Sequence, residues 1–194
     1  MDVRPVILEG SHVRLEPLSM DHHPAMCEVA LDDSLWQWTS PRLRTADDVR
    51  SYMATAIRAQ SAGTALPFAT VERDSGRVVG GTRYANISRD DRRVEIGWTF
   101  VATAWQRTPI NTEAKYLMLR HAFETWHCVR VELKTDVLNQ RSRRAIERLG
   151  AKQEGILRSH MIMDTGRVRD TVYYSILNTE WPEVKSRLQG MLAR

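Results

Sequence analysis

The segment R-V-E-I-G-W-T-F-V at residues 93–101 constrains the fold more than any other part of the sequence. Apolar and other side chains alternate along it, which is typical of a strand with one buried face. We expect Val94, Ile96, Trp98 and Phe100 to share one face, and Glu95, Gly97, Thr99 and Val101 to share the other. A turn-rich stretch and a helical pattern follow at once. The sequence therefore predicts a strand–turn–helix unit at the centre of the chain.

Further strands and helices are expected on both sides of this unit in the sequence. Further strands are expected at residues 12–18, 66–72, 77–87, 129–137, 154–163 and 168–177. Helices are expected at residues 20–31, from a cap at Thr45 to before Gly63, at 111–126, at 140–149 and from 182 onward. This order predicts an α/β (α+β) fold with a mixed, mostly antiparallel sheet of about seven strands and helices on both faces. One domain is expected over residues 1–194, because a chain of this length can bury a full core.

The N-terminal segment, the distribution of apolar residues and the two cysteines indicate the cellular compartment of the protein. Residues 1–11 carry charge and lack the apolar core of a signal peptide, and no segment approaches the roughly 18 apolar residues of a membrane span. Cys27 and Cys128 show neither metal-ligand spacing nor a pairing pattern, so they predict buried thiols in a reducing compartment. We therefore expect a cytoplasmic protein without a metal site or a membrane partner.

The net charge of +4 leaves nucleic-acid binding as a weak alternative. The basic residues are spread along the chain, and the densest run lies on the helix expected at 140–149. That run consists of Arg141, Arg143, Arg144 and Arg148. Such a run is more often a solvated helix face, and a ligand with several phosphates explains it equally well. No aromatic-interleaved motif of a nucleic-acid-binding module accompanies it.

Four segments, in order, resemble the GNAT superfamily of acyl-CoA-dependent N-acyltransferases, and within it the RimJ/RimL branch, which acetylates protein N-terminal amines. They are V-E-I-G-W-T-F at 94–100, Q-R-T-P-I-N-T-E-A-K at 106–115, N-Q-R-S-R-R-A-I-E-R-L-G-A at 139–151, and E-G-I-L-R with R-D-T-V-Y-Y-S-I-L at 154–158 and 169–177. They are similar to the central strand, the pyrophosphate loop Q/R-x-x-G-x-G/A, the N-x-x-S…LGA segment and the closing hairpin of that family. The resemblance implies a GNAT fold and acetyl transfer from acetyl-CoA to a primary amine.

The turn before the helix expected at 111–126 is the candidate cofactor site. Backbone N–H groups at a helix start attract a pyrophosphate, although periodicity alone fits a plain strand–helix connection equally well. The resemblance implies that acetyl-CoA contacts Val101, Gln106, Arg107, Thr108, Ile110, Asn111, Thr112, Asn139 and Ser142. Pro109 and Asn111 stand where the family pattern has glycines, and Arg107 where many members have glycine. An amide and a guanidinium can rebuild such an anion site.

Three residues are candidates for proton transfer. Without the resemblance, Glu95 reads as an ion-pair partner, Ser142 as a serine bonded to its own helix, and His160 as a surface residue. The resemblance implies that Glu95 deprotonates the incoming ammonium through water, with His160 as the alternative base. It also implies that Ser142 protonates the leaving thiolate, since Ile146 stands where many GNAT enzymes have a tyrosine. Asn139 is expected to cap its helix as well as contact the cofactor.

The acceptor is left open by the sequence. Trp36 and Trp38 fall in the loop after the first helix, where GNAT enzymes bind their acceptor, and packing accounts for them equally well. A protein N-terminus, a free amino acid, a polyamine-like amine and an aminoglycoside-like drug are all alternatives. A homodimer is compatible with the sequence. The alternative function is a degenerate GNAT domain that binds CoA or a partner without catalysis, although an intact Glu95 and Ser142 argue against it.

Overall fold

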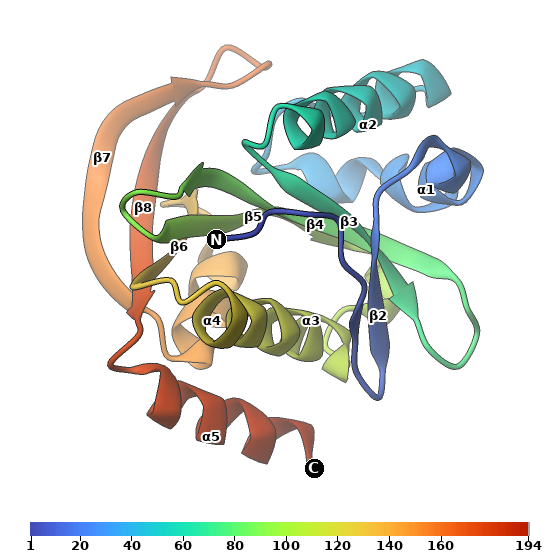
Figure 1. Cartoon of the computed structure of the whole chain (residues 1–194). Helices are drawn as coiled ribbons and strands as arrows, with labels where there is room; N and C mark the ends of the chain where they lie inside the picture. Colours follow the sequence, from blue (N-terminus) through green and yellow to red (C-terminus); the bar gives the residue numbers. More distant parts are fainter. Residues whose placement is uncertain (194) are drawn as a thin grey trace.

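The computed structural model describes residues 1–193, in which an eight-stranded sheet lies between two layers of helices (Figure 1). The strands are β1 (Leu8–Glu9), β2 (Val13–Pro17), β3 (Leu66–Glu72), β4 (Val78–Ser88), β5 (Arg93–Val101), β6 (Arg130–Asp136), β7 (Lys152–Ile162) and β8 (Val168–Leu177). Their order across the sheet is β1-β2-β3-β4-β5-β6-β8-β7, and only β5 and β6 run parallel. The strand beyond the expected seven is β1, because Leu8 and Glu9 pair with β2.

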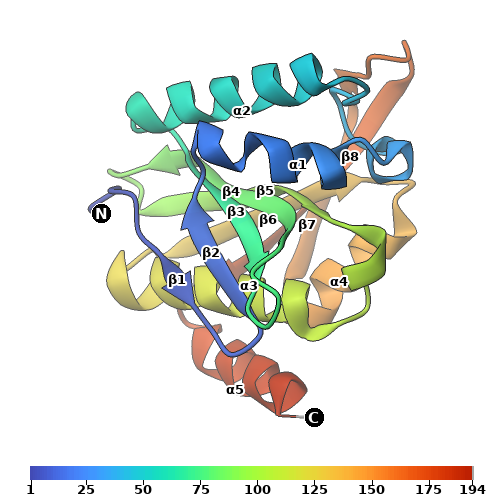
Figure 2. The same cartoon turned by 90° about the vertical axis from the view of Figure 1, so that its right-hand side faces the viewer.

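Helices cover both faces of the sheet. α1 (His23–Ala30) and α2 (Ala46–Ser61) lie on one face, and α3 (Pro109–Arg120), α4 (Gln140–Leu149) and α5 (Trp181–Leu192) lie on the other (Figure 2). Thr45 starts α2 with the expected capping box, in which its side chain accepts a hydrogen bond from the backbone of Asp48. Within residues 1–193, no helix combines the length and apolarity needed to cross a membrane.

Each face of the sheet has its own apolar core. Val94 and Ile96 of β5 pack with α3, whereas Phe100 of the same strand packs with α1 and α2. Val94, Ile96, Trp98 and Phe100 were expected to share one face of the strand. That expectation holds for Val94 and Ile96 and is wrong for the residues after Gly97. A strict two-residue alternation cannot place Ile96 and Phe100 on opposite faces, so one residue must break it.

A β-bulge at Trp98 breaks the alternation. Gly97 pairs with Arg83 and Phe100 pairs with Gly81, so β5 has one more residue than β4 between these two pairs. Trp98 adopts the left-handed conformation with φ of 49°. Gly80 lets the bulged strand approach, since a Cβ atom there would lie 2.1 Å from the carbonyl oxygen of Phe100. The bulge also turns Trp98 outward, leaving it 39% exposed.

A buried carboxylate ties the N-terminal segment to α3. The side chain of Glu113 accepts hydrogen bonds from the backbone N–H groups of Ser11, His12 and Val13 at 2.8, 2.6 and 2.8 Å. A Cβ atom at Gly10 would lie 2.4 Å from the Glu113 carboxyl carbon, so glycine is needed for this close approach. The contact fixes the position of α3 relative to β2.

The two cysteines are unpaired. Cys128 is buried and Cys27 is half-buried, so only Cys128 matches the expected degree of burial. Burial raises the pKa of the Cys128 thiol to about 11, which keeps it protonated and unreactive at neutral pH. Within residues 1–193, no three His, Cys, Asp or Glu side chains are grouped so that they could hold a metal ion.

Candidate active site

The parallel strands β5 and β6 separate at the centre of the sheet. They pair only from Arg93 to Glu95 on β5 and from Arg130 to Glu132 on β6. Beyond these residues, β5 continues alongside β4, and β6 continues alongside β8. The facing edges of β5 and β6 therefore present backbone groups that the sheet does not use. An extended ligand rich in amides can pair with such edges.

The turn between β5 and α3 presents backbone donors. Thr108 caps α3, since its hydroxyl accepts a hydrogen bond from Ile110 N–H and donates one to the carbonyl of Trp105. The backbone N–H groups of Arg107, Thr108 and Asn111 have no hydrogen-bond partner within residues 1–193. Three free donors at a helix start form an anion-binding arrangement.

Arg107 and Pro109 both fit this turn. Arg107 has a φ of 65°, in the left-handed region that favours glycine. The backbone thus keeps the conformation expected of a glycine, although a side chain is attached. Pro109 occupies the first helical position, where a proline leaves the helix intact and removes one first-turn donor. The departures from the glycine pattern therefore change the side chains around the turn and preserve its shape.

Two arginines of α4 contact the segment that leads into α3 and the first turn of that helix. The side chain of Gln106 donates to the carbonyl of Val101 at 2.9 Å and accepts from Arg141 at 2.8 Å. Arg148 donates to the hydroxyl of Thr112 at 3.1 Å. The basic run on α4 therefore lies partly beside the free donors rather than wholly on a solvated face. Sequence spacing within α4 could not show this, because it contains no information on which helix lies opposite.

The expected cofactor residues of α3 have different environments. The Ile110 side chain is buried in the core, so only its backbone is available to a ligand. The Thr112 hydroxyl is also buried and is bonded to Arg148. Asn111 differs, because its buried side-chain oxygen has no hydrogen-bond partner within residues 1–193. This oxygen accepts hydrogen bonds, so a water molecule that hydrates a bound anion can satisfy it, whereas the anion itself cannot. The free N–H groups beside it are donors, so they fit a diphosphate.

Asn139 and Ser142 lie at the start of α4. Asn139 caps the helix, as expected, because its side-chain oxygen accepts a hydrogen bond from the Ser142 N–H at 3.0 Å. The Ser142 hydroxyl is half-buried and makes no hydrogen bond to its own helix or to any other described residue. Ile146 and Leu149, on the same helix face, are buried against the sheet. The Ser142 hydroxyl is thus on the sheet side of α4 and is free to contact a ligand.

Glu95 is the most buried acid of the candidate site, with 1% of its surface exposed. Its Oε2 atom accepts a hydrogen bond from Asn86 at 2.7 Å and lies 3.0 Å from the Lys134 ammonium. Its Oε1 atom has no hydrogen-bond partner within residues 1–193 and faces Gly97, where a Cβ atom would lie 2.9 Å away. The carboxylate is therefore held in place through Oε2, and Oε1 is free to accept a hydrogen bond from a ligand or water. Asn86 and Lys134 come from neighbouring strands and are absent from the sequence prediction.

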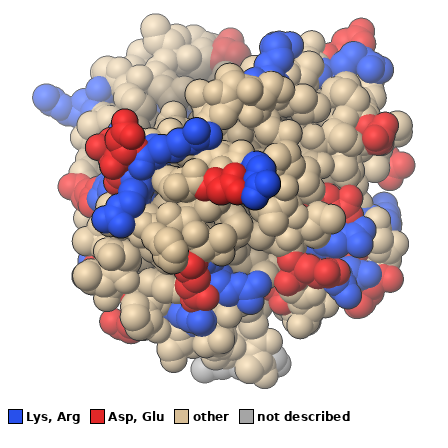
Figure 3. Space-filling view, viewed as in Figure 1, with Lys and Arg blue, Asp and Glu red and all other residues tan. Residues whose placement is uncertain are grey.

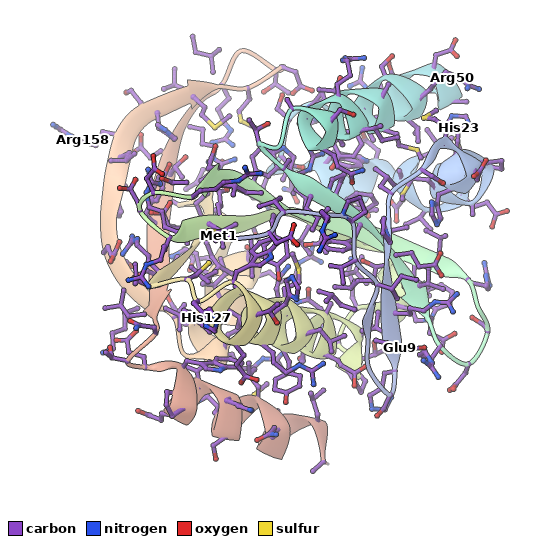
Figure 4. The ribbon with its side chains drawn as sticks, viewed as in Figure 1. Met1, Glu9, His23, Arg50, His127 and Arg158 are labelled. Atoms are coloured by element: carbon purple, nitrogen blue, oxygen red, sulfur yellow. The ribbon has the colours of Figure 1, made fainter. Side chains whose placement is uncertain are left out.

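His160 lies on the outer edge strand, β7, and is exposed. Arg158, two residues earlier, projects from this edge into solvent (Figure 4). The His160 ring meets the Tyr173 ring edge-on at 5.9 Å, and Tyr173 in turn lies 5.7 Å from the Lys134 ammonium. His160 thus faces the same region as Glu95 without contacting it directly.

The two tryptophans expected to bind the acceptor occupy different environments. Trp36 is 4% exposed, donates to the Ala30 carbonyl at 2.7 Å and packs against Phe100. It is a core residue, because the 3₁₀ turn Asp33–Trp36 directs its ring inward, so we withdraw it as an acceptor contact. Trp38 is half-buried, and the guanidinium of Arg167, in the turn between β7 and β8, lies 5.5 Å from its ring centre.

The surface charges form no basic groove on the face shown in Figure 3. Lysine and arginine side chains there are interspersed with aspartate and glutamate. A surface cavity of about 210 Å³ is lined by Glu9, Arg14, Val71, Glu72, Arg73 and Gly76 and includes none of the candidate site residues. The candidate site is therefore assigned to the region where β5 and β6 diverge, and not to this cavity.

This combination of a split parallel pair, a donor-rich helix start and a central acid defines an acyltransferase of the GNAT type. The family model for the acetyltransferase (GNAT) domain matches residues 12–152, and the chain belongs to this family.

Known relatives agree with this assignment. A Bacillus subtilis (strain 168) protein, provisionally named ribosomal N-acetyltransferase YdaF, is 33% identical over 106 residues, which span 55% of this chain and 57% of that protein. A GCN5-related N-acetyltransferase from Brucella melitensis is 31% identical, with a TM-score of 0.90 over 97% of this chain and 86% of that one. Mycobacterium smegmatis RimJ, solved with CoA-disulfide, shares the fold at 24% identity, with a TM-score of 0.80 over 96% and 92% of the chains.

Proposed function

We propose that this protein transfers the acetyl group of acetyl-CoA to a primary amine, with a protein N-terminus as the favoured acceptor. The observation that carries the proposal is a free carboxylate oxygen on β5, where it diverges from β6, together with a free hydroxyl at the start of α4, the helix that follows β6. Glu95 provides the first and Ser142 the second. The name of the Bacillus subtilis relative supports a ribosomal protein as the acceptor.

The proposed reaction is a direct attack. The neutral amine nitrogen forms a bond to the thioester carbonyl carbon, the carbon–sulfur bond breaks, and the sulfur leaves as a thiolate. Glu95 Oε1 accepts the proton of the ammonium through a water molecule, because only the neutral amine can attack. The Ser142 hydroxyl donates its proton to the thiolate, and water carries to Ser142 the proton that the attacking nitrogen loses as the amide forms. A backbone N–H of β5 stabilises the transient oxyanion, and the protein holds both reactants in line.

The proposed acetyl-CoA site runs from the α3 start to Ser142. The free N–H groups of Arg107, Thr108 and Asn111 would hold the diphosphate, and the unused edge of β5 up to Val101 would pair with the amide-rich arm. Arg107 and Arg141 would add positive charge beside it. The CoA-disulfide bound to Mycobacterium smegmatis RimJ supports this choice of ligand.

Charge reversal at Arg107 tests the anion site. We expect Arg107→Glu to weaken acetyl-CoA binding roughly tenfold, because a carboxylate beside the diphosphate replaces an attraction with a repulsion. Isothermal titration calorimetry measures the dissociation constant. Arg89→Glu is the control, since it makes the same charge change in the loop between β4 and β5. Arg107→Gly keeps the left-handed backbone and should show a smaller loss. Equal losses for Arg107→Glu and Arg89→Glu would place the diphosphate elsewhere.

Ser142→Ala separates two roles of that residue. If its hydroxyl protonates the thiolate, the maximal rate should fall roughly tenfold, near the lower end of acid–base assistance, because a thiolate leaves easily. The melting temperature should stay equal or rise slightly, since alanine favours a helix more than serine. Both quantities are measured on one purified variant. An unchanged rate would leave water as the proton donor.

Thiol release in the presence of acetyl-CoA tests the function as a whole. A panel of an N-terminal peptide, a free amino acid, a polyamine and an aminoglycoside should show release with the peptide above the rate of acetyl-CoA hydrolysis. If calorimetry shows acetyl-CoA binding but no amine gives thiol release, the domain binds the ligand without catalysis. We also propose a cytoplasmic location, in keeping with two unpaired thiols.

A further inference from the structure

The sheet face that carries Glu95 also carries a buried arginine without an acidic partner. Arg83 of β4 is 8% exposed, and its side chain makes no hydrogen bond or ion pair with any residue from 1 to 193. Its guanidinium lies 5.0 Å from the centre of the Tyr52 ring and 4.9 Å from the centre of the Trp98 ring. A charged group of this kind is expensive to bury, and two aromatic rings offset only part of that loss of hydration.

Arg83 and Glu95 face the same space. Arg83 pairs with Gly97 across β4 and β5, and Ala85 pairs with Glu95, so all four side-chain positions are on one face of the sheet. The bulged Trp98 lies between the two charged groups, because its ring contacts both Arg83 and Lys134, the ion-pair partner of Glu95. A substrate amine near Glu95 thus places neighbouring groups of the same molecule near Arg83.

The other charges on this face show that Arg83 is not compensated from a distance. Lys134 is paired with Glu95, and Arg167 is paired with the buried Asp136. Arg169 of β8 is also buried, and among residues 1–193 its side chain hydrogen-bonds only to the hydroxyl of Thr171. At the outer end of this face, Arg130 is paired with Glu132 and Glu154, which leaves Arg83 and Arg169 as the cations of the face without an ion-pair partner among residues 1–193. A cationic acceptor would be repelled here, and an anionic one would be attracted.

The cavity next to Arg83 cannot satisfy it internally. This cavity, lined by Tyr52, Arg83 and Phe100 among others, has a volume of about 10 Å³. Such a space holds at most about one water molecule. A partner for the guanidinium must therefore approach past the exposed edge of Trp98, from the side on which the acceptor binds.

We propose that Arg83 binds a carboxylate carried by the amine substrate and so selects anionic acceptors over polyamines and aminoglycosides. This inference rests on the proposed acetyl transfer to an amine. A guanidinium forms two parallel hydrogen bonds to a carboxylate, and the flanking rings of Tyr52 and Trp98 hold its plane in place. Two sources share this chemistry: an acidic side chain close to a peptide N-terminus, and the α-carboxylate of a free amino acid.

Calorimetry on matched acceptors tests the proposal in the presence of saturating CoA, where binding is measured without turnover. The peptide pair is Ala-Asp-Ala amide and Ala-Asn-Ala amide, and the amino-acid pair is alanine and alaninamide. The wild type should bind the acidic member of at least one pair roughly 10- to 100-fold more tightly, and the responding pair identifies the source. Raising the salt concentration should narrow this difference, and spermidine should not bind.

Variants connect the preference to Arg83. Arg83→Met should remove the difference between acid and amide, and Arg83→Lys should retain part of it. Arg120→Met is the matched control, because Arg120 also lies over a tyrosine ring, Tyr116, but on the opposite face of the sheet, and its loss should change nothing. Equal binding of acid and amide by the wild type overturns the proposal, even if Arg83→Met fails to fold. A folded Arg83→Met variant that keeps the preference also overturns it.

The proposed transfer itself is tested separately with the neutral peptide. Ala-Asn-Ala amide does not need Arg83, so thiol release from acetyl-CoA with this peptide reports acetyl transfer alone. A wild type that prefers the acidic acceptor but releases no thiol supports the role of Arg83 and contradicts the transfer. Thiol release without a preference for the acidic acceptor supports acetyl transfer and contradicts the role of Arg83.

Discussion

Glu95→Gln should lower the turnover number roughly 100-fold or more at pH 7 and leave the dissociation constant for acetyl-CoA unchanged. The substitution keeps the shape of the side chain but removes its capacity to accept a proton, and general base assistance is worth about 10²–10⁴-fold. The measurement is the steady-state rate of thiol release with a peptide acceptor, together with calorimetry of acetyl-CoA. Acetyl-CoA should bind normally because the proposed diphosphate donors lie in the turn before α3 and the arm pairs with the backbone of β5, so neither contact uses the Glu95 side chain.

The pH dependence makes this prediction specific. A peptide α-amino group has an ordinary pKa of about 7.7–8.0, so the neutral, reactive fraction of the substrate rises between pH 7 and pH 9. The loss caused by Glu95→Gln should shrink over this interval, because the amine then needs no base. A loss that stays constant with pH would show that Glu95 is not the base, and His160→Gln would be the next variant.

Two controls separate catalysis from structure. Glu132→Gln changes a carboxylate at the β6 position that pairs with Glu95, and it should leave the rate nearly unchanged because Glu132 is engaged with Arg130. Lys134→Met removes the ammonium that holds Oε2 of Glu95. If the effect of Glu95→Gln came from an unpaired Lys134, the double variant with Lys134→Met should recover most of the activity.

Glu113→Ala should destabilise the protein by about 3 kcal/mol or more. The substitution leaves the backbone N–H groups of Ser11, His12 and Val13 without their acceptor, and an unsatisfied buried donor costs about 1–3 kcal/mol. Partial hydration of the first two limits the total. For a chain of this size, such a change lowers the melting temperature by roughly 6–12 °C. Thermal and denaturant unfolding give the two quantities.

Glu28→Ala is the control for this prediction. Glu28 is an exposed helical glutamate that lies 3.9 Å from Arg77, and its replacement should change the free energy of unfolding by no more than about 0.5 kcal/mol. A loss below about 1 kcal/mol for Glu113→Ala would mean that the N-terminal segment contributes little to stability, contrary to its three hydrogen bonds.

The local sequence determined most of the secondary structure. The strands Leu66–Glu72, Arg93–Val101 and Val168–Leu177 and the helix Gln140–Leu149 have the expected bounds. Alternation, helical spacing and capping residues act within a few positions of the chain, so they can be seen without knowing the fold. The helix before the π-helical turn His121–Thr125 begins two residues earlier than expected, because Thr108 caps it and Pro109 fits its first position.

The residues of the candidate site come from the family resemblance and stay a prediction. Asn139 shows where prediction from the sequence alone is strongest. A helix cap is a contact between residues three positions apart, and the expected cap is present. Trp36 shows the opposite case. Whether a loop tryptophan contacts a ligand or fills a core depends on what lies beneath the loop, and here Phe100 and Tyr52 lie beneath it.

The tertiary structure alone decided the contacts that set the chemistry. The partners of Glu95 come from β4 and β6, the two arginines at the α3 turn come from α4, and Arg83 is left unpaired by the same arrangement. The bulge at Trp98 moved Phe100 to the other face, because strand pairing with β4 overrode the alternation of the sequence. The sequence by itself determined the elements and the family, since these depend on neighbouring residues. Which charged groups meet depends on strand register and helix placement, which only the folded chain fixes.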